Sequence, residues 1–387
     1  MNIAIFTNNY LPNPYGVTTS IESFRGQFEE KGHRVYIFAP QSSDWIDQNP
    51  NVFRYPSVDF NFKIKFPLPI PYSAEIDSVI DGLELDIIHS QHPNLLGSVA
   101  KRWAKKKKIP LVFTWHTLYD QYTNYIPFVP SGITAKWAID NAVEYANSCD
   151  AVVVPTNSIK PAIEKWGVEN KEIATIPTGV DTTFFEGEKR GDEIRESLGL
   201  SSDDIVLLTV SRLAEEKNVE FLLESTIEAM KQNEKLKFVI GGEGYLDEEL
   251  KKVVKKNALE ERIFFTGLIK KDKLKDYFDA ADVFVYSSKS ETQGTIITEV
   301  MHSGLPIVAL DSLGVCDLIR DGGNGFLVKD SKDDFSSAIL KLVDDFKLRE
   351  EFGKKSSEIA KSNYTDDVCS DKMLRLYEKV IEEKNNI

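Results

Sequence analysis

The sequence contains little cysteine and no long apolar run. Its three cysteines, Cys149, Cys316 and Cys369, are widely separated among 387 residues. No Cys-x-x-Cys pair occurs, which argues against a disulfide framework and against a structural zinc site. No segment approaches the ~20 apolar residues that span a bilayer, and Met1–Phe6 lacks the basic residues of an export signal. We therefore expect a cytoplasmic protein that does not cross a membrane.

Basic residues are in the minority. The chain carries 47 Lys and Arg against 61 Asp and Glu, a formal net charge of −14, which argues against non-specific binding of nucleic acid. Hydrophobic residues make up 42% of the sequence, enough for large cores, and its 387 residues exceed what one core normally covers. We expect a folded protein of two domains with no nucleic-acid partner.

Short β-branched runs alternate with longer amphipathic segments along the whole chain. This pattern predicts an α/β protein in which parallel strands alternate with helices. The interval Asp181–Ser201 is charged and poor in apolar residues, so we place the boundary between two similar domains near Gly179–Arg190. The strand candidates are Asn2–Phe6, Arg34–Phe38, Asp86–Ser90, Pro110–Thr114 and Ala151–Pro155, then Asp204–Val210, Leu236–Ile240, Arg262–Phe265, Asp282–Tyr286 and Pro306–Leu310.

The expected organisation is a Rossmann-like domain over residues 1–180, a second one over residues 181–365, and a C-terminal helix over residues 366–387 that could cross back to the first domain. Thr19 and Glu22 have the spacing of a capping box and predict a helix start there. Open parallel sheets bind ligands at the carboxyl ends of their strands. Candidate site residues are therefore expected just after the strands.

The segment Glu291–Glu299 carries two carboxylates after a predicted strand. We expect the next helix to begin near Thr295 and to stop at Gly304, so that Gly294 and Thr295 present backbone N–H groups that suit a phosphate. Eight residues of continuous helix would separate the carboxylates by ~12 Å, whereas a glycosidase pair needs about 5 to 9.5 Å. We interpret both as hydrogen-bond acceptors for sugar hydroxyls. The alternative is one solvated loop glutamate and one on a helix surface.

Two cations follow the strand that ends at Val210. Arg212 can fork onto two phosphate oxygens and Lys217 can act as a point charge, so the loop Ser211–Asn218 can converge on a diphosphate. A charged surface loop is the alternative. The chain has no Asp-x-Asp triplet. We therefore expect these cations and helix amides, rather than a bound divalent metal, to offset the charge of a diphosphate.

Two glycine-containing loops also follow predicted strands. Gly16 closes a loop rich in Pro and Asn and removes a side chain where a phosphate can approach the backbone; a simple turn glycine is the alternative. Gly241–Gly244, which includes Glu243, could lie against a base and a ribose. A glycine-rich turn by itself is weak evidence for a nucleotide site.

His116 ends another predicted strand, where a neutral imidazole could hold a sugar hydroxyl. The alternative is a core histidine bonded to backbone, and we assign that role to the other histidines, His33, His89, His92 and His302. The loop after His116 is unusually aromatic and could cover an acceptor with a large apolar portion. Its candidate acceptor-binding residues are Tyr119, Asp120, Tyr122 and Tyr125.

Two segments are candidates for contact with a membrane surface. The aromatic and lysine-containing segment Phe60–Tyr72 could dip into an interface, or be a Pro-rich loop packed on its own domain. A cluster of six cations could attract anionic lipid, although lysines at the end of a helix also suit the helix dipole. The cluster comprises Lys101, Arg102, Lys105, Lys106, Lys107 and Lys108.

Taken together, these residues resemble a retaining glycosyltransferase of the GT-B fold, in the large fourth family that uses nucleotide-diphospho-sugars. The resemblance covers nearly the whole chain. Within the family, the chain is most similar to bacterial diacylglycerol glucosyltransferases, at Asn9–Pro12, Gly16–Ile21 and the Tyr-rich stretch after His116. It departs at Tyr15, where many members have glycine, and at Cys316-Asp317, where a glutamate is usual. The motifs that carry it, in order, are Gly16-Val17, Gly32–Val35, the His116 segment, Pro177–Asp181, Ser211-Arg212 with Glu216-Lys217, and Glu291 with Glu299.

The resemblance implies a role for each candidate. Arg212 and Lys217 would hold the diphosphate, with help from Gly16 and the amides near Gly294 and Thr295. Glu299 would bind the ribose and Glu291 the sugar hydroxyls, while His116 would face the sugar near its C6 hydroxyl. Gly241, Glu243 and Gln293 would complete the donor site. The acceptor hydroxyl would attack from the side of the leaving group, whose phosphate takes the proton, so that no protein base is required.

The resulting hypothesis is transfer of a hexose, with UDP-glucose as the expected donor, to a lipid such as 1,2-diacylglycerol at the cytoplasmic face of the plasma membrane. It requires a UDP-sugar co-substrate and no metal. The alternatives are the same chemistry on a soluble or polysaccharide acceptor, a nucleotide-sugar epimerase of similar architecture, and a non-catalytic sugar-binding protein.

Overall fold

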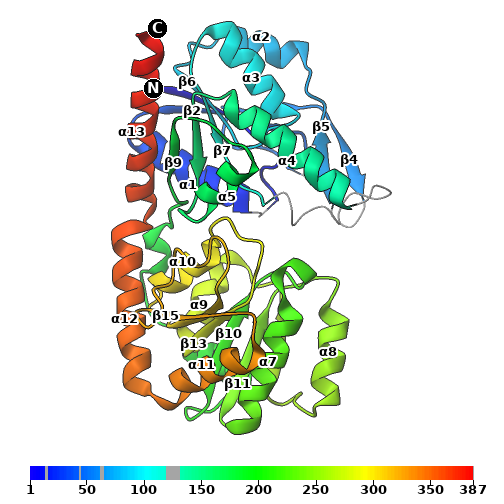
Figure 1. Cartoon of the computed structure of the whole chain (residues 1–387), viewed down its shortest axis with the longest axis vertical. Helices are drawn as coiled ribbons and strands as arrows, with labels where there is room; N and C mark the ends of the chain where they lie inside the picture. The colour runs from blue at the N-terminus through cyan, green and yellow to red at the C-terminus, as the bar shows by residue number, and fades with distance from the viewer. Residues whose placement is uncertain (14–15, 43–44, 62–64, 119–130, 387) are drawn as a thin grey trace. The chain divides into compact units, whose positions relative to one another are not determined.

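The computed structural model describes residues 1–13, 16–42, 45–61, 65–118 and 131–386. The chain divides into two compact units, Met1–Gly179 together with Asp366–Ile387, and Val180–Thr365. Each unit is built around a parallel β-sheet with helices on both faces (Figure 1). The α/β fold class predicted from the alternating sequence pattern is confirmed.

The sheet of the first unit has seven strands in the order β3-β2-β1-β6-β7-β8-β9. All its pairings are parallel, and the order reverses between β1 and β6. A separate antiparallel hairpin is formed by β4 (Ser57–Asn61) and β5 (Lys65–Pro69). The strands of the main sheet are β1 (Asn2–Phe6), β2 (Arg34–Pro40), β3 (Val52–Tyr55), β6 (Ile87–Ser90), β7 (Leu111–Thr114), β8 (Ala151–Val154) and β9 (Ile173–Thr175).

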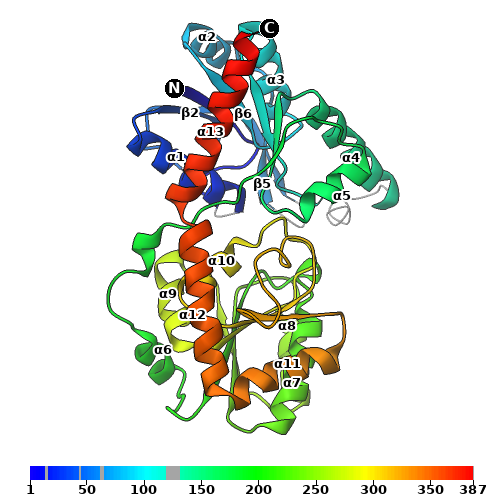
Figure 2. The same ribbon diagram turned by 60° about the vertical axis from the view of Figure 1, so that its left-hand side comes forward.

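Alternation of side chains along each strand feeds two cores. On β1, Ile3 and Ile5 face the helices α1 (Gly16–Glu30) and α13 (Asp366–Asn385), which lie side by side in Figure 2. Ala4 and Phe6 face the opposite core, as the period of two along a strand requires. That core is covered by α2 (Ala74–Gly82), α3 (Leu96–Lys107), α4 (Ser131–Asn147) and α5 (Ile159–Trp166).

Helix α13 is held on the first unit by both charge and a buried hydrogen-bond chain. Lys31 on α1 pairs with Asp367 and Asp371. Tyr377, which is fully buried, bonds through its hydroxyl to His89 Nδ1 at 2.5 Å, and His89 Nε2 lies 2.7 Å from Thr114 Oγ1. The last helix therefore reaches the ends of β6 and β7.

The second unit has a six-stranded parallel sheet in the order β12-β11-β10-β13-β14-β15. Its strands are β10 (Ile205–Val210), β11 (Leu236–Gly241), β12 (Ile263–Gly267), β13 (Val283–Tyr286), β14 (Ile307–Leu310) and β15 (Gly325–Val328). One face packs on α7 (Val219–Gln232), α8 (Asp247–Lys256) and α11 (Lys332–Asp344). The other packs on α9 (Leu274–Ala280), α10 (Thr295–His302) and part of α12 (Phe346–Asn363), and α6 (Gly191–Ser197) lies against α9. The strand order reverses between β10 and β13.

Several local predictions need correction. Helix α1 begins at Gly16, so Thr19 and Glu22 lie inside it and do not form a capping box; Glu22 instead pairs with Arg25 and accepts a bond from Tyr10. Helix α10 begins at Thr295 and its last residue is His302, with Gly304 at φ +76° directly after the C-cap residue Ser303, so the predicted start and glycine stop are both confirmed. The short edge strands β3, β9 and β15 and the β4–β5 hairpin were not predicted, because each strand has only three to five residues, too few to show a clear alternating pattern.

The buried chain Tyr377–His89–Thr114 generates a stability prediction. In Tyr377→Phe, His89 Nδ1 loses its partner while remaining buried, so we expect the free energy of unfolding in urea to fall by about 1–3 kcal/mol. The control is Tyr72→Phe, because Tyr72 is 63% exposed and its hydroxyl can bond to water. Equal stability of the two variants would contradict the assigned role of the chain.

Candidate active site

In each unit, the candidate residues follow the strands at which the sheet order reverses. In the second unit these strands are β10, followed by the loop Ser211–Asn218, and β13, followed by Ser287–Gly294. In the first unit they are β1 and β6, with β7 next to β6. Connections leave such a point in opposite directions, which opens a crevice at the carboxyl ends of the strands. Parallel topology thus brings together residues that are far apart in the sequence.

Glu291 is the best-supported carboxylate of the second unit. Its Oε1 pairs with Lys217 Nζ and accepts hydrogen bonds from Tyr286 OH at 2.7 Å and Ser288 Oγ at 2.8 Å. The side chains of Lys217 and Glu291 are each 14% exposed. Burial acts to raise the pKa of Glu291, but the charge of Lys217 and the bonds from the three donors outweigh it and lower that pKa. The pair is therefore ionised and fixed.

Serines join the two loops that carry this ion pair. Ser287 Oγ lies 2.9 Å from the carbonyl oxygens of both Lys217 and Asn218, and its single proton is shared between them. Ser290 Oγ donates to the carbonyl oxygen of Glu216 at 3.3 Å. The segment Ser287–Ser290 thus fixes the position of the Lys217 backbone relative to Glu291. Sequence reasoning missed these serines, since hydroxyls in a loop carry no signal without their partners.

Gly314 fixes the Glu291 loop from the other side. Its φ is +77°, and a Cβ placed there would lie 2.5 Å from the carbonyl oxygen of Glu291 and 2.8 Å from the carbonyl carbon of Thr292. Only glycine permits so close an approach. Ser312 Oγ adds a bond to the carbonyl oxygen of Ser288 at 2.8 Å. Like the serines, Gly314 helps to position Glu291 and was not identified from the sequence.

The start of α10 offers backbone donors beside Glu291. Gly294 is the N-cap residue with φ +76° and has no side chain of its own to cap the helix; Gln293 is buried at 3% exposure. The N–H groups of the first turn, beginning at Thr295, suit an anion. Glu299 lies one turn further, where burial raises its pKa to about 7, partly opposed by the charge of Lys271. Glu299 therefore changes charge near neutral pH.

The remaining residues predicted for the donor site belong to packed loops. Arg212 pairs with Glu216 at 2.6 Å within its own loop. A Cβ at Gly241 would meet Ile269 at 2.4 Å, and one at Gly242 would meet the carbonyl oxygen of Ser211 at 1.8 Å. Glu243 Oε1 accepts a bond from the Leu268 backbone at 3.3 Å. Close packing against Ile269 and Ser211 therefore requires glycine at Gly241, the last residue of β11, and at Gly242.

His116 lies in a group of buried and half-buried polar residues in the first unit. Its Nε2 is 2.6 Å from Gln91 Oε1. Burial, followed by the charges of His92 and His89, lowers the pKa of His116 to about 3, and burial lowers that of His92 to about 4. His92 Nδ1 accepts a bond from the backbone N–H of Asn8 at 3.1 Å. These imidazoles are neutral at physiological pH.

Other predicted residues are placed as follows. Gly16 is the first residue of α1, and a Cβ there would meet nothing within 4 Å. The candidate acceptor residues Tyr119, Asp120, Tyr122 and Tyr125 lie outside the described residues. His33 Nδ1 contacts the amino terminus at 2.9 Å, and His302 stacks on Phe185. Cys149 and Cys369 are buried, whereas Cys316 is half-buried.

The cationic cluster at the end of α3 is partly neutralised. Arg102 pairs with Asp77 at 2.8 Å and Lys106 with Asp81 at 2.6 Å. Lys107 donates to the carbonyl oxygens of Asp81 and Leu83, and Lys101 lies 6.0 Å from the ring centroid of Tyr145. Lys105 and Lys108 are exposed.

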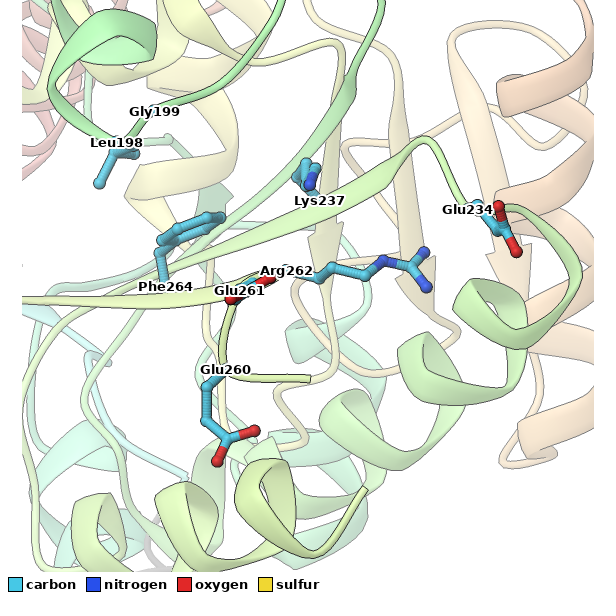
Figure 3. Close-up of a pocket in the computed structure, with 8 residues that line it drawn as sticks. All are labelled: Leu198, Gly199, Glu234, Lys237, Glu260, Glu261, Arg262 and Phe264. Carbon is cyan, nitrogen blue, oxygen red and sulfur yellow. The ribbon is translucent and has the colours of Figure 1, made fainter. Parts of the chain in front are cut away.

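A hollow of about 800 Å³ lies elsewhere in the second unit (Figure 3). It is lined by residues at the beginnings of β11 and β12, including Lys237 and Phe264. It therefore lies at the amino ends of the strands, whereas the loops that carry Lys217 and Glu291 follow the carboxyl ends. Its Arg262 already donates to the carbonyl oxygens of Met230, Asn233 and Leu236. Arg262 therefore has a structural role between these backbone segments, and the hollow is not part of the candidate active site.

Comparison with known proteins identifies the family. The profile described as "Glycosyl transferases group 1" matches residues 191–358, and that described as "Glycosyltransferase Family 4" matches residues 14–184. An alpha-monoglucosyldiacylglycerol synthase of Streptococcus pneumoniae is 31% identical over 353 residues, covering 89% of this chain and 78% of the relative. The chain therefore belongs to the glycosyltransferase family that these two profiles describe.

The names of other proteins similar to this glycosyltransferase specify different sugars and donors. The alpha-monoglucosyldiacylglycerol synthase of Acholeplasma laidlawii is 28% identical over 100% of this chain and 98% of its own. A GDP-mannose-dependent alpha-mannosyltransferase of Corynebacterium glutamicum is 27% identical over 89% of this chain and 81% of its own. The crystal structure of Anabaena HepE with UDP and glucose has a TM-score of 0.77 at 17% identity, covering 97% of this chain and 99% of its own, which supports the GT-B fold.

Gly314 generates a prediction about the glycosyltransferase site. In Gly314→Ala, the new Cβ would displace the backbone at Glu291 and Thr292, and we expect turnover to fall by about 10²-fold, as for a misplacement of ~1 Å. The matched control is Gly322→Ala in the same unit, which has φ +68° but no atom within 4 Å of an added Cβ. Equal losses in both variants would mean that backbone strain, and not displacement of Glu291, is responsible.

Glu299 generates a pH prediction. Its pKa in the folded protein is about 7, above the ordinary value of 4.5, so the folded state binds the proton more tightly than the unfolded state. Its contribution to stability is therefore present below pH ~4.5 and is lost as the pH rises to ~7. We expect Glu299→Gln to be more stable than wild type at pH 8, with the difference shrinking toward pH 5. A pH-independent difference in unfolding free energy would refute the raised pKa.

Proposed function

We propose that this glycosyltransferase transfers a hexose, with retention of the anomeric configuration, from a UDP-sugar to a lipid acceptor. The donor we favour is UDP-glucose and the acceptor 1,2-diacylglycerol, which gives an α-glycolipid. The observation that carries the donor half is the fixed Lys217–Glu291 pair beside the N-terminus of α10. The acceptor half is supported by two of the relatives, which are alpha-monoglucosyldiacylglycerol synthases.

In this proposal the second unit stabilises the leaving group. Lys217 and Arg212 supply positive charge to the diphosphate, and the first-turn amides of α10 near Gly294 and Thr295 add hydrogen bonds. A diphosphate and Glu291 would share Lys217, so charge remains balanced as the bond to the sugar breaks. Glu291 accepts bonds from sugar hydroxyls, and Glu299 accepts them from the ribose. Gln293, Gly241, Gly16 and Glu243 complete the donor contacts.

In the first unit, His116 offers a neutral hydrogen-bonding group that suits a sugar hydroxyl. His116 stays uncharged at neutral pH because burial lowers its pKa to about 3, which suits a contact to a hydroxyl rather than to a phosphate. With no protein base required, the attacking acceptor hydroxyl gives its proton to the departing phosphate on the same face of the sugar. Attack on that face preserves the anomeric configuration. Tyr119, Asp120, Tyr122 and Tyr125 are proposed to contact the acceptor.

Contact with an anionic membrane surface is proposed to deliver the lipid acceptor. Lys105 and Lys108 are exposed at the end of α3. Apolar side chains are also exposed along β5 and just after it, with Leu68 at 39%, Ile70 at 45% and Tyr72 at 63% exposure. No helix among the described residues is long and apolar enough to span a bilayer. Peripheral association with the inner face of the plasma membrane fits these features.

Release of nucleoside diphosphate tests the proposed reaction. The purified protein is offered UDP-glucose, UDP-galactose, UDP-N-acetylglucosamine and GDP-mannose, each with vesicles of anionic lipid that contain or lack diacylglycerol. We expect release from UDP-glucose that rises at least ~10-fold with diacylglycerol, and an α-anomeric product. Release that ignores diacylglycerol would favour a soluble or polysaccharide acceptor. Release confined to GDP-mannose would overturn the UDP assignment, and release without transfer would contradict both acceptors.

The membrane contact makes a separate prediction. Removing two exposed lysines in Lys105→Gln with Lys108→Gln should weaken binding to anionic vesicles by about 30-fold, from ~1 kcal/mol per lysine, without changing affinity for the donor. The matched control is Lys255→Gln with Lys256→Gln, which removes two exposed lysines from the last turn of α8 in the other unit. Unchanged vesicle binding in the first variant would exclude this cluster.

A further inference from the structure

Gln91 is a buried residue next to the candidate histidine of the first unit. It follows the last residue of β6 and is 5% exposed, and its Oε1 lies 2.6 Å from His116 Nε2. Its backbone is fixed as well, because the N–H of Gln91 donates to the carbonyl oxygen of Phe6 on β1 at 2.9 Å. Since β6 and β7 are parallel neighbours, Gln91 and His116 emerge at the same edge of the sheet.

The contact determines where the imidazole carries its proton. An amide oxygen can only accept a hydrogen bond, so Nε2 of His116 must be the protonated nitrogen. The ring is neutral, because burial and the nearby His92 and His89 lower its pKa to about 3. His89 is buried and His92 is half-buried, and loss of solvent lowers the pKa of each. The lone pair of the His116 ring therefore resides on Nδ1.

We infer that Gln91 is a positioning residue that fixes His116 as the Nε2–H tautomer. Because a neutral imidazole has one donor and one acceptor nitrogen, this tautomer lets Nδ1 accept a hydrogen bond but not donate one, so that in the proposed contact the substrate hydroxyl is the donor. It excludes donation from Nδ1 to a phosphate or carbonyl oxygen. The inference deepens the proposed function and rests on His116 contacting substrate.

The tautomer can be measured without activity. With 15N-labelled histidine, the shifts of Nδ1 and Nε2 report which nitrogen carries the proton, and the chain has only 5 histidines. His116→Asn assigns its signals by their loss. We expect wild type at pH 7 to show a single Nε2–H form and Gln91→Leu to show a mixture of the two tautomers. An Nδ1–H form in wild type, or an unchanged form in Gln91→Leu, would overturn the inference.

Activity provides a readout that a merely structural glutamine would not move. In Gln91→Glu, a carboxylate beside Nε2 raises the pKa of His116, and imidazolium has no lone pair at Nδ1. We expect kcat/KM to acquire a new acidic limb between pH 5 and 7, and Gln91→Leu to lose about tenfold in kcat with little change in donor KM. The control is Gln41→Glu, an exposed glutamine in the same unit, which should keep the wild-type profile.

The outcomes separate the inference from the proposed function. Full turnover in His116→Asn would contradict the proposed contact between His116 and substrate, and the tautomer measurement would still decide the role of Gln91. Loss of turnover in His116→Asn combined with a wild-type pH profile in Gln91→Glu would overturn only the positioning role. A new acidic limb together with tautomer mixing in Gln91→Leu supports both.

Discussion

The ion pair between Lys217 and Glu291 constrains the rest of the second unit. Two opposite charges at 14% exposure each are tolerable only together and with further hydrogen bonds, because either one alone would be a poorly solvated charge. The sequence around them satisfies this requirement: Tyr286 and Ser288 donate to the carboxylate, while Ser287 and Ser290 hold the loop of Lys217. The strand order then places both loops where the sheet opens.

The two units contribute polar groups of different kinds. The second presents paired charges and the helix amides of α10, which suit a ligand that is charged and changes its charge during reaction. The first presents buried imidazoles with pKa values lowered to about 3 and about 4, together with amide and hydroxyl groups, which suit neutral hydroxyls. Helix α13 adds to the polar environment of the first unit, because Tyr377 bonds to His89 and His89 bonds to Thr114.

The sequence predicted the features that depend on local pattern. Alternating apolar runs identified the two parallel sheets, and Gly294 before Thr295 identified the start of α10. It could not supply partners that meet only through the fold. Tyr286 looks like one more apolar strand residue until its hydroxyl is seen at Glu291, and Gln91 carries no motif. Likewise, Arg102 and Lys106 read as one basic run, yet Asp77 and Asp81 on α2 neutralise them.

The central claim is that Lys217 and Glu291 act as one unit in sugar transfer, and a double-mutant cycle on donor turnover tests it most directly. Release of nucleoside diphosphate from the preferred donor would be measured for Lys217→Met, Glu291→Gln and the double variant. The account predicts that each single variant loses about 10²-fold or more and that the double variant loses little beyond either one. Losses that multiply, or near-normal turnover in either single variant, would contradict it.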